Sequence, residues 1–475
     1  MIHFQIPRNS PTLYKSIACT HSETMPEPTI SNSLAYYLGD IKKRIDNQEH
    51  EWDVYKRYTN PYEYIHTNTP GKRKSISKIK PLSRSYFKMI EVVQFFRLLE
   101  NKNNIRSFHL AEGPGGFIEA LAFMRSNNAD EYTGMTILDN DPNIPSWKKS
   151  QYFLRENPNV KIETGADKTG NILSIENFVY CREKYASSMD IITADGGFDF
   201  SVDFNSQENY IAQLLFGQIV YALCMQKCDG SFILKVFDCF MKHTLDILAI
   251  LSSFYEKVYI TKPQTSRYAN SEKYIVCKGF LFDATQVNDC IPYLHNAFET
   301  MIMQPNCINR SNGYGHDLSK IYISRFLSSS LSLSFTMRIE EYNAIFGQQQ
   351  IENIYYTLSL IENKHKHEKV DNLIKTNMQR CVNWCIKHNI PYFPIVTSGT
   401  TNIFDMSITS MDTEYKNGFL GDLHNNIVQK PKVTKQPYFR PVLMTTENEN
   451  GSTIGSNNSQ NINIEISEIS QNLEH

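Results

Sequence analysis

Short apolar runs alternate with stretches of helical spacing between about residues 72 and 280. The apolar runs are HLAE, TGMTIL, VKIE, DIITAD, GSFILKVF, VYITKP and KYIVCKGFLF. Short strands that alternate with helical segments are typical of an α/β domain with a mostly parallel sheet. The pattern therefore predicts one α/β domain over residues 71–285.

The last of these runs, KYIVCKGF, follows VYITKP after a short polar connection. Two neighbouring parallel strands need a long crossover connection, usually a helix, and this connection is too short to hold one. We therefore predict that the last strand of the sheet is antiparallel.

The segments on either side of the α/β domain have a different pattern. Leu34, Tyr37, Leu38, Ile41 and Ile45 recur at helical spacing, which predicts an N-terminal helical extension over residues 1–70. Helical spacing from about residue 318 predicts a mainly helical C-terminal unit, 286–435, which is also the expected contact for a protein partner. After Arg440 the chain has no Lys or Arg and is rich in Asn, Ser and Glu, so we expect residues 436–475 to be disordered.

A glycine-rich turn lies in FHLAEGPGGFIEAL, residues 108–121. An apolar strand leads into Glu112, and helical spacing begins after Gly116, an arrangement that can cradle a ligand. The turn lacks the Lys-Ser/Thr pair of a triphosphate loop and the third glycine of the dinucleotide fingerprint. By itself, the motif leaves a ligand cradle and a plain tight corner equally open.

Three charged residues lie next to predicted strand ends. Asp195 ends the strand DIITAD, and in a parallel sheet the ligand crevice lies beyond such carboxyl ends. Lys235 follows the apolar run SFIL, and burial of a lysine lowers its pKa and favours a general base. Glu272 precedes KYIVC and is within reach of Lys235. The alternatives are a turn-capping Asp, a lysine that extends to solvent and a solvated loop.

A basic run precedes the glycine turn, in GKRKSISKIKPLSRSYFKMIEV. It contains no acidic residue from Lys72 to Lys88, and such a run is usually a solvated face. A helix that begins near Ser83 would pack its apolar side on the sheet and direct Lys88 toward the crevice. Basic residues beside a crevice suit a phosphodiester backbone.

Composition says more about where the protein is located than about what it does. The chain has 475 residues with 48 Lys+Arg and 50 Asp+Glu, so nucleic-acid binding must come from local patches. Ten cysteines without dense spacing favour reduced thiols and an intracellular protein in the cytoplasm or nucleus. Because no signal segment or membrane span is evident, we expect no contact with a membrane.

In order along the chain, these motifs resemble one family. Lys88, AEGPGGF, Asp195 in TADGG, Lys235 in LKVF and Glu272 in SRYANSEKYIV are similar to the FtsJ-like S-adenosylmethionine-dependent ribose 2′-O-methyltransferases. SRSYFKMIEV and the SRxxNSExYxV form resemble its mRNA cap-methylating branch, found in eukaryotes and large DNA viruses. The similarity covers residues 80–282, under half of the chain. If the source is viral, the expected location is the virion or host cytoplasm.

The resemblance implies a Rossmann-like methyltransferase sheet, S-adenosyl-L-methionine as cofactor, no metal, and capped mRNA as the RNA partner. It implies that the catalytic residues are Lys88, Asp195, Lys235 and Glu272. The implied cofactor-binding residues are Glu112, Gly113, Pro114, Gly115, Gly116, Phe117, Asp139, Asp167 and Asp195. Expected RNA-binding residues are Lys72, Arg73, Lys74, Arg84 and Arg267.

Other interpretations remain open. The RNA substrate could be ribosomal, or the chain could be a catalytically silent RNA-binding subunit that kept the fold. The pairs Cys224/Cys228 and Cys381/Cys385 have helical i, i+4 spacing and are read as thiols on one helix face rather than zinc ligands. Trp52, Tyr55, Tyr62 and Tyr64 are read as core aromatics, with base stacking as the alternative.

Overall fold

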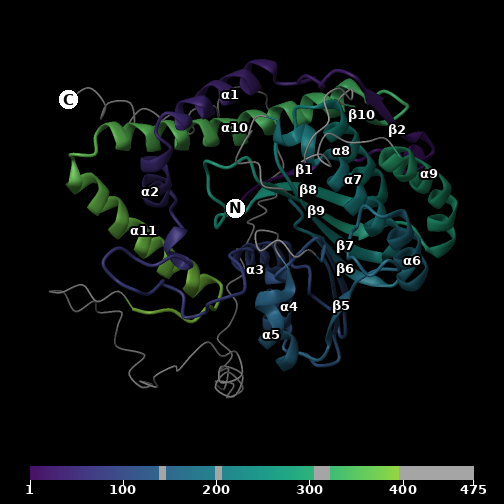
Figure 1. Ribbon diagram of the computed structural model, residues 1–475, viewed down its shortest axis with the longest axis horizontal. Helices are drawn as coiled ribbons and strands as arrows, with labels where there is room; N and C mark the ends of the chain where they lie inside the picture. Colours follow the sequence, from purple (N-terminus) through teal and green to yellow (C-terminus); the bar gives the residue numbers. More distant parts are fainter. Residues whose placement is uncertain (139–145, 198–205, 304–320, 395–475) are drawn as a thin grey trace, which may run out of the picture. The chain divides into compact units, whose positions relative to one another are not determined.

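The computed structural model describes residues 1–138, 146–197, 206–303 and 321–394 (Figure 1). Asp139, residues 304–320 and 395–435 of the predicted C-terminal unit, and the predicted disordered tail lie outside these described residues. No helix among the described residues is both long enough and apolar enough to span a membrane.

An eight-stranded sheet organises the α/β part, in the order β1-β8-β9-β7-β6-β3-β4-β5. The strands are β1 (Ile2–Ile6), β3 (Arg106–Leu110), β4 (Glu131–Met135), β5 (Val160–Glu163), β6 (Met189–Ala194), β7 (Gln226–Val236), β8 (Tyr255–Lys262) and β9 (Lys273–Phe280). Strands β3 to β7 pair in parallel, and β9 pairs antiparallel with both β7 and β8. The predicted α/β class and the antiparallel last strand are confirmed.

Helices cover both faces of the sheet. On one side pack α3 (Ser85–Phe96), α4 (Gly116–Arg125) and α5 (Gln151–Glu156), and on the other α6 (Ile175–Tyr185), α7 (Gln207–Met225), α8 (Lys242–Phe254) and α9 (Ala284–Met303). Figure 1 shows α3, α4 and α5 grouped together, with α6 to α9 apart from them. A short 3-10 turn, Trp147–Ser150, leads into α5.

Side-chain alternation decides which face each strand residue meets. Ile191 and Ile233 belong to the core with α3 and α4, whereas Ile192 and Leu234 belong to the core with α7 and α8. Successive residues of a strand point to opposite faces. Lys235, which follows Leu234, therefore lies on the same face as α3.

The N-terminal extension is not wholly helical, which corrects the expectation for residues 1–70. It contains β1, which pairs antiparallel with β8, and β2 (Ile17–Ser22), which pairs with β10 (Tyr322–Leu327). The helical part is a 3-10 turn at Pro11–Ser16, α1 (Asn32–Asp46), α2 (Glu49–Thr59) and a second 3-10 turn at Glu63–Ile65. The two strands depend on partners distant in sequence, so local patterning could not reveal them.

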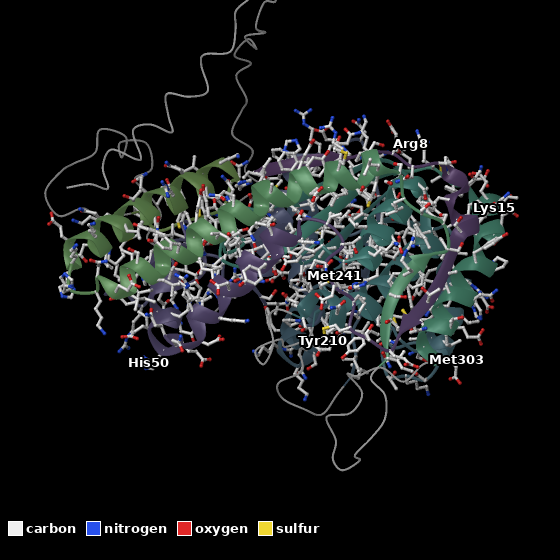
Figure 2. The ribbon with its side chains drawn as sticks, turned by 90° about the horizontal axis from the view of Figure 1, so that it is seen from above. Arg8, Lys15, His50, Tyr210, Met241 and Met303 are labelled. Atoms are coloured by element: carbon white, nitrogen blue, oxygen red, sulfur yellow. The ribbon has the colours of Figure 1, made fainter. Side chains whose placement is uncertain are left out.

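The C-terminal part is mainly helical, as predicted. Its described residues hold most of α9, the strand β10, and the helices α10 (Leu333–Glu362) and α11 (His367–Lys387). Helix α10 packs against α1 and α2, and α11 packs against α2 and the turn at Glu63–Ile65. Figures 1 and 2 show α10 running alongside α1. The N-terminal and C-terminal helices thus form one packed layer.

A buried ion pair joins β10 to α8. The Asp246 carboxylate accepts hydrogen bonds from Arg325 Nε at 2.6 Å and Nη2 at 3.0 Å, and from the backbone N–H groups of Phe326 at 2.9 Å and Leu327 at 3.3 Å. Its side chain is 0% exposed. Since the two backbone N–H groups and Arg325 Nε would be left without this acceptor, the carboxylate is needed to hold β10 on the domain.

We expect Asp246→Ala to lower the free energy of unfolding by about 3–5 kcal/mol, because it leaves the Arg325 guanidinium uncompensated. Chemical denaturation monitored by circular dichroism measures the change. Glu341→Ala, which breaks the exposed pair with Arg338, is the control and should leave the midpoint unchanged. Equal midpoints for the two variants would contradict the structural role of Asp246.

Candidate active site

Four charged residues meet at the carboxyl edge of β6 and β7. Lys88 comes from α3, Asp195 directly follows β6, Lys235 is near the end of β7, and Glu272 directly precedes β9. Their side chains are at most 15% exposed. The structure therefore brings together all four residues that the sequence singled out as catalytic.

These residues form two lysine–carboxylate pairs. Lys88 Nζ lies 2.6 Å from Glu272 Oε1 and donates to Oε2 at 2.7 Å. Lys235 Nζ donates to the backbone carbonyl of Asp195 at 2.7 Å and lies 3.3 Å from its Oδ1. Glu272 pairs with Lys88 here, whereas the sequence suggested that it would hold Lys235.

Burial and charge act in opposite directions in this cluster. Burial by itself would raise the pKa of Glu272, but Lys88 and Lys235 hold that pKa well below its usual range. Burial lowers the pKa of Lys88, and Glu272 only partly offsets this effect. Glu272 is therefore an anion between two lysines, and protonation of Lys88 depends on that anion.

Tyr274 is a site residue that the sequence analysis missed. Its hydroxyl donates to Asp195 Oδ1 at 3.0 Å, and Lys88 Nζ lies 5.8 Å from the centre of its ring. The signal was available in principle, because Tyr274 lies two residues after Glu272 and strand alternation puts both on one face. Ser266 is a second such residue, and its hydroxyl donates to Glu272 Oε1 at 2.7 Å.

The glycine-rich turn connects β3 to α4 at this same edge. Ala111 has a positive φ of 52° and Gly115 one of 99°. The buried Glu112 carboxylate accepts from Phe117 N at 2.7 Å and Thr193 Oγ1 at 2.7 Å, and its Oε2 lies 3.1 Å from His109 Nδ1. Glu112 thus shapes the turn from inside, while the N-terminus of α4 faces the carboxyl edge of the sheet.

The glycines of the turn are needed for packing within the protein. A Cβ atom on Gly116 would collide with the Ser83 and Ser85 hydroxyls, so this glycine lets α4 begin against the start of α3. On Gly115, a Cβ would lie 3.0 Å from the Trp147 ring, and its φ of 99° also disfavours a side chain. Close approach of a ligand, which the motif suggested, is not the constraint that these contacts reveal.

Asp139 and Asp167 are the two remaining cofactor candidates. Asp139 lies outside the described residues. Asp167 is exposed, and its Oδ1 accepts from Thr169 N at 2.8 Å and Asn177 Nδ2 at 2.8 Å. The carboxylate of Asp167 therefore stabilises its own loop and keeps an exposed side.

The basic candidates fall into two groups. Lys72, Arg73 and Lys74 are exposed, and Lys74 Nζ lies 4.9 Å from the centre of the Phe393 ring. Arg267 is instead held by the buried Glu63, with contacts of 3.0 Å and 2.6 Å. Arg84 donates to Thr265 O at 3.3 Å, and its buried Nε has no hydrogen-bond partner among the described residues. Of these basic candidates, only the first group is exposed to solvent.

The structure corrects one cysteine interpretation. Cys224 lies in α7 but the exposed Cys228 lies in β7, so these two thiols do not share a helix face. Cys381 and Cys385 are both buried on α11, as a shared face requires. Within the described ranges, no three His, Cys, Asp or Glu side chains are grouped to hold a metal ion. Trp52 and Tyr64 are core residues.

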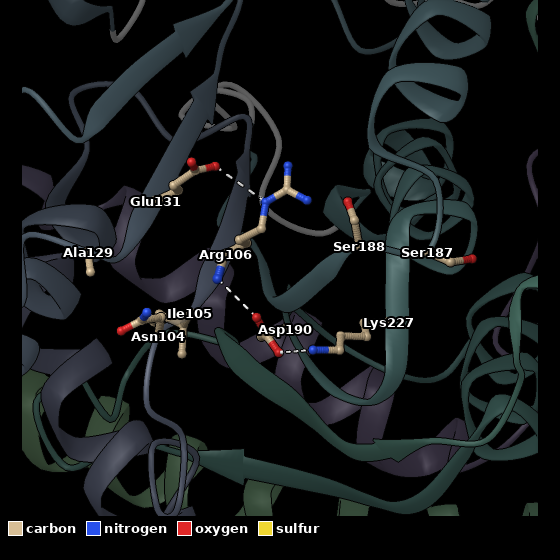
Figure 3. Close-up of a pocket in the computed structure, with 9 residues that line it drawn as sticks. All are labelled: Asn104, Ile105, Arg106, Ala129, Glu131, Ser187, Ser188, Asp190 and Lys227. Carbon is tan, nitrogen blue, oxygen red and sulfur yellow. Dashed lines mark hydrogen bonds and ion pairs between the residues drawn. The ribbon is translucent and has the colours of Figure 1, made fainter.

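Two cavities lie elsewhere on the surface. One, of about 460 Å³, is at the amino-terminal ends of β3, β4 and β6, opposite the carboxyl edge. Figure 3 shows its charged residues in contact, Arg106 with Glu131 at 3.3 Å and Lys227 with Asp190 at 3.3 Å. The other, of about 560 Å³, lies between α1 and Met241, labelled in Figure 2. Neither contains any of the four charged residues.

Comparisons with known proteins find similarity in the α/β part. Residues 81–280 match the model of the FtsJ-like methyltransferase family. The cap-specific mRNA (nucleoside-2′-O-)-methyltransferase 2 of Drosophila melanogaster is 25% identical over 296 residues, which cover 58% of this chain and 39% of that protein. The corresponding methyltransferase 1 of Trypanosoma brucei brucei is 38% identical over 178 residues, or 36% of this chain and 45% of that protein.

Comparison with solved structures also gives a match to only part of this chain. A Plasmodium falciparum structure described as a ribosomal RNA methyltransferase shares 22% identity with a TM-score of 0.31, and the match covers 42% of this chain and 98% of that one. The present chain spans less than half of the two cap-specific relatives. The four charged residues at the carboxyl edge all fall within residues 81–280, the part of this chain that is similar to the FtsJ-like methyltransferase family.

Proposed function

We propose that this chain transfers a methyl group from S-adenosylmethionine to a ribose 2′-hydroxyl of RNA, at a nucleotide next to the mRNA cap. The observation that carries the proposal is the meeting of the pairs Lys88–Glu272 and Lys235–Asp195 in a buried site at the carboxyl edge of a methyltransferase sheet. The cap specificity is supported by the relatives, with which this chain shares part of their length.

The family match implies S-adenosylmethionine-dependent chemistry. In our proposal the methionine end binds at the turn from Glu112 to Phe117, because the N-terminus of α4 begins there and favours a carboxylate. Asp195 lies at the neighbouring strand end, on the same edge. Asp139 is proposed for the cofactor ribose and the exposed side of Asp167 for the adenine.

The proposed chemistry centres on Lys235. S-adenosylmethionine supplies an electrophilic methyl group on a positively charged sulfur. In the proposed step, Lys235 takes the proton of the 2′-hydroxyl as this oxygen bonds to the methyl carbon and the carbon–sulfur bond breaks, which releases S-adenosylhomocysteine. The Asp195 carbonyl and carboxylate orient the Lys235 amine. Asp195, whose Oδ1 lies 3.3 Å from Lys235 Nζ, stabilises the ammonium that forms on proton transfer.

The proposed RNA contacts lie on the basic run and beside the site. Lys72, Arg73 and Lys74 are exposed and suited to phosphate contacts. Arg84 and Arg267 bind protein groups around Glu63 and Thr265, so their proposed contribution is to the positive potential next to the acceptor nucleotide.

Mass analysis of short RNAs after incubation with S-adenosylmethionine tests the activity. We expect capped RNA to gain one methyl group, and the same RNA with a 2′-deoxynucleotide next to the cap to gain none. Equal methylation of uncapped RNA would favour a ribosomal or other RNA substrate. RNA binding without methylation of any RNA would favour the silent subunit.

Lys235→Ala should lower methyl transfer by about 10²–10⁴-fold and leave cofactor binding largely intact, because the amine acts on the acceptor hydroxyl. Gly115→Val should instead weaken cofactor binding, since a side chain there meets Trp147 and strains the turn. Calorimetric titration of S-adenosylmethionine, run beside the transfer assay, separates the two effects. Lys257→Ala, an exposed lysine of β8, is the control. Near-normal turnover of Lys235→Ala would rule out the general-base role.

Replacing Lys72, Arg73 and Lys74 with Ala should weaken RNA binding and lower the slope of log affinity against log salt by about 2, because three phosphate contacts are lost. Lys161, Lys227 and Lys257 are exposed, carry the same total charge and lie toward the opposite edge of the sheet. Their triple Ala variant is the matched control, and an identical slope for both variants would show that the basic run is only solvated.

A further inference from the structure

Three consecutive carbonyl groups before β9 each accept a hydrogen bond from a buried lysine. Lys262 Nζ donates to the carbonyls of Asn270 and Glu272, the latter at 3.0 Å. Lys273 Nζ donates to the Ser271 carbonyl at 2.8 Å. The two lysines are 6% and 4% exposed. The backbone of residues 270–272 is therefore bound by two lysine side-chain nitrogens in the protein interior.

The two lysines lie on the opposite face of the sheet from Lys88. Lys262 shares its face with Ile260, and Lys273 shares its face with Ile275, both of which pack in the core with α7 and α8. The Glu272 side chain extends to the other face, where it meets Lys88. Glu272 is thus held by its side chain from one face and by its backbone from the other.

Burial of two cations at this position opposes folding. Burial and the charge of Lys273 lower the pKa of Lys262 to about 7. Asp238 compensates in part, at 3.6 Å from Lys273 and 3.3 Å from Lys42. Buried charges are kept only where they are paired and hydrogen-bonded. Both amines nevertheless keep their hydrogen bonds to the carbonyls of residues 270–272, so this segment is held in place despite the desolvation cost.

The rest of the loop from β8 to β9 is bound as firmly. The Glu91 carboxylate of α3 accepts from Gln264 N at 2.7 Å and Thr265 N at 3.2 Å. Gln350 of α10 donates to the Ala269 carbonyl at 3.0 Å. Both ends of the loop are thus anchored. Glu272 belongs to the segment 270–272 that the two lysines bind, so release of this segment would move Glu272.

We propose that Lys262 and Lys273 are positioning residues for the methyl-transfer site, which hold the backbone of residues 270–272 so that Glu272 stays against Lys88. The proposal rests on the proposed function. Both lysines act on the alignment of the site, and neither contacts the cofactor or the RNA. Misplacement of a site group by about 1 Å can cost on the order of 10²-fold in rate.

Lys262→Met and Lys273→Met remove the ammonium groups and keep most of the apolar stem. We expect each variant to lower kcat by about 10-fold or more, with little change in the KM for RNA or in the Kd for S-adenosylmethionine. Lys278→Met is the matched control, because Lys278 of β9 also donates to a backbone carbonyl, that of Phe96, at 2.7 Å, but away from Glu272. It should leave kcat unchanged.

A double-mutant comparison shows whether the effect passes through Glu272. In the Glu272→Gln background, Lys262→Met should cause little further loss of kcat, because residues that act through one group are not additive. A loss equal to that in the wild-type background would overturn the positioning role. If Lys262→Met fails to fold, Lys273→Met, which loses a single carbonyl bond, decides in the same way.

Hydrogen exchange provides a readout that does not need activity. Amides of residues 266–274 should exchange at least about 10-fold faster in Lys262→Met than in Lys278→Met if the segment is released. Faster exchange with unchanged kcat would overturn the proposal, as would unchanged exchange. If the wild-type chain methylates no RNA, the proposed function fails, and exchange alone then decides whether the lysines hold the segment.

Discussion

The buried ion pair between Lys88 and Glu272 is the constraint on which the site depends. Its two partners are 184 residues apart in sequence and come from α3 and from the loop before β9. A charge taken out of water is strongly unfavourable unless its partner is held in contact, so neither residue can be buried without the other. Helix α3, the loop from β8 to β9 and the sheet between them must therefore keep a fixed relative position.

The sheet makes this position possible, because successive residues of a strand direct their side chains to opposite faces of the sheet. Glu272, Tyr274 and Lys235 direct their side chains to the face that α3 covers, where they meet Lys88 and Asp195. On the other face, Lys262 and Lys273 bind the backbone that carries Glu272. The antiparallel β9 joins the two sets, since it begins directly after Glu272 and pairs with β7, which carries Lys235.

The same edge of the sheet accounts for the proposed separation of donor and acceptor chemistry. The turn at Glu112 to Phe117 belongs to β3 and α4, whereas the two lysine pairs belong to β6, β7, β9 and α3. A cofactor bound at the turn and a ribose bound near Lys235 would meet beyond the carboxyl ends of neighbouring parallel strands. Serine hydroxyls at the start of α3 also pack on Gly116, so the two halves of the site are in direct contact.

The sequence by itself determined the alternation of strands and helices, because hydrophobic period is a local property of the chain. The short connection before KYIVCKGF predicted the antiparallel last strand. Lys88, Asp195, Lys235 and Glu272 were named as one set through the resemblance of their motifs to a family. The sequence did not determine that Glu272 pairs with Lys88, that Arg267 is held by Glu63 or that Ile2–Ile6 is an edge strand. Each of these depends on a partner many residues away. Only the tertiary structure decided them, because which charges and strands meet is set by packing across the whole sheet.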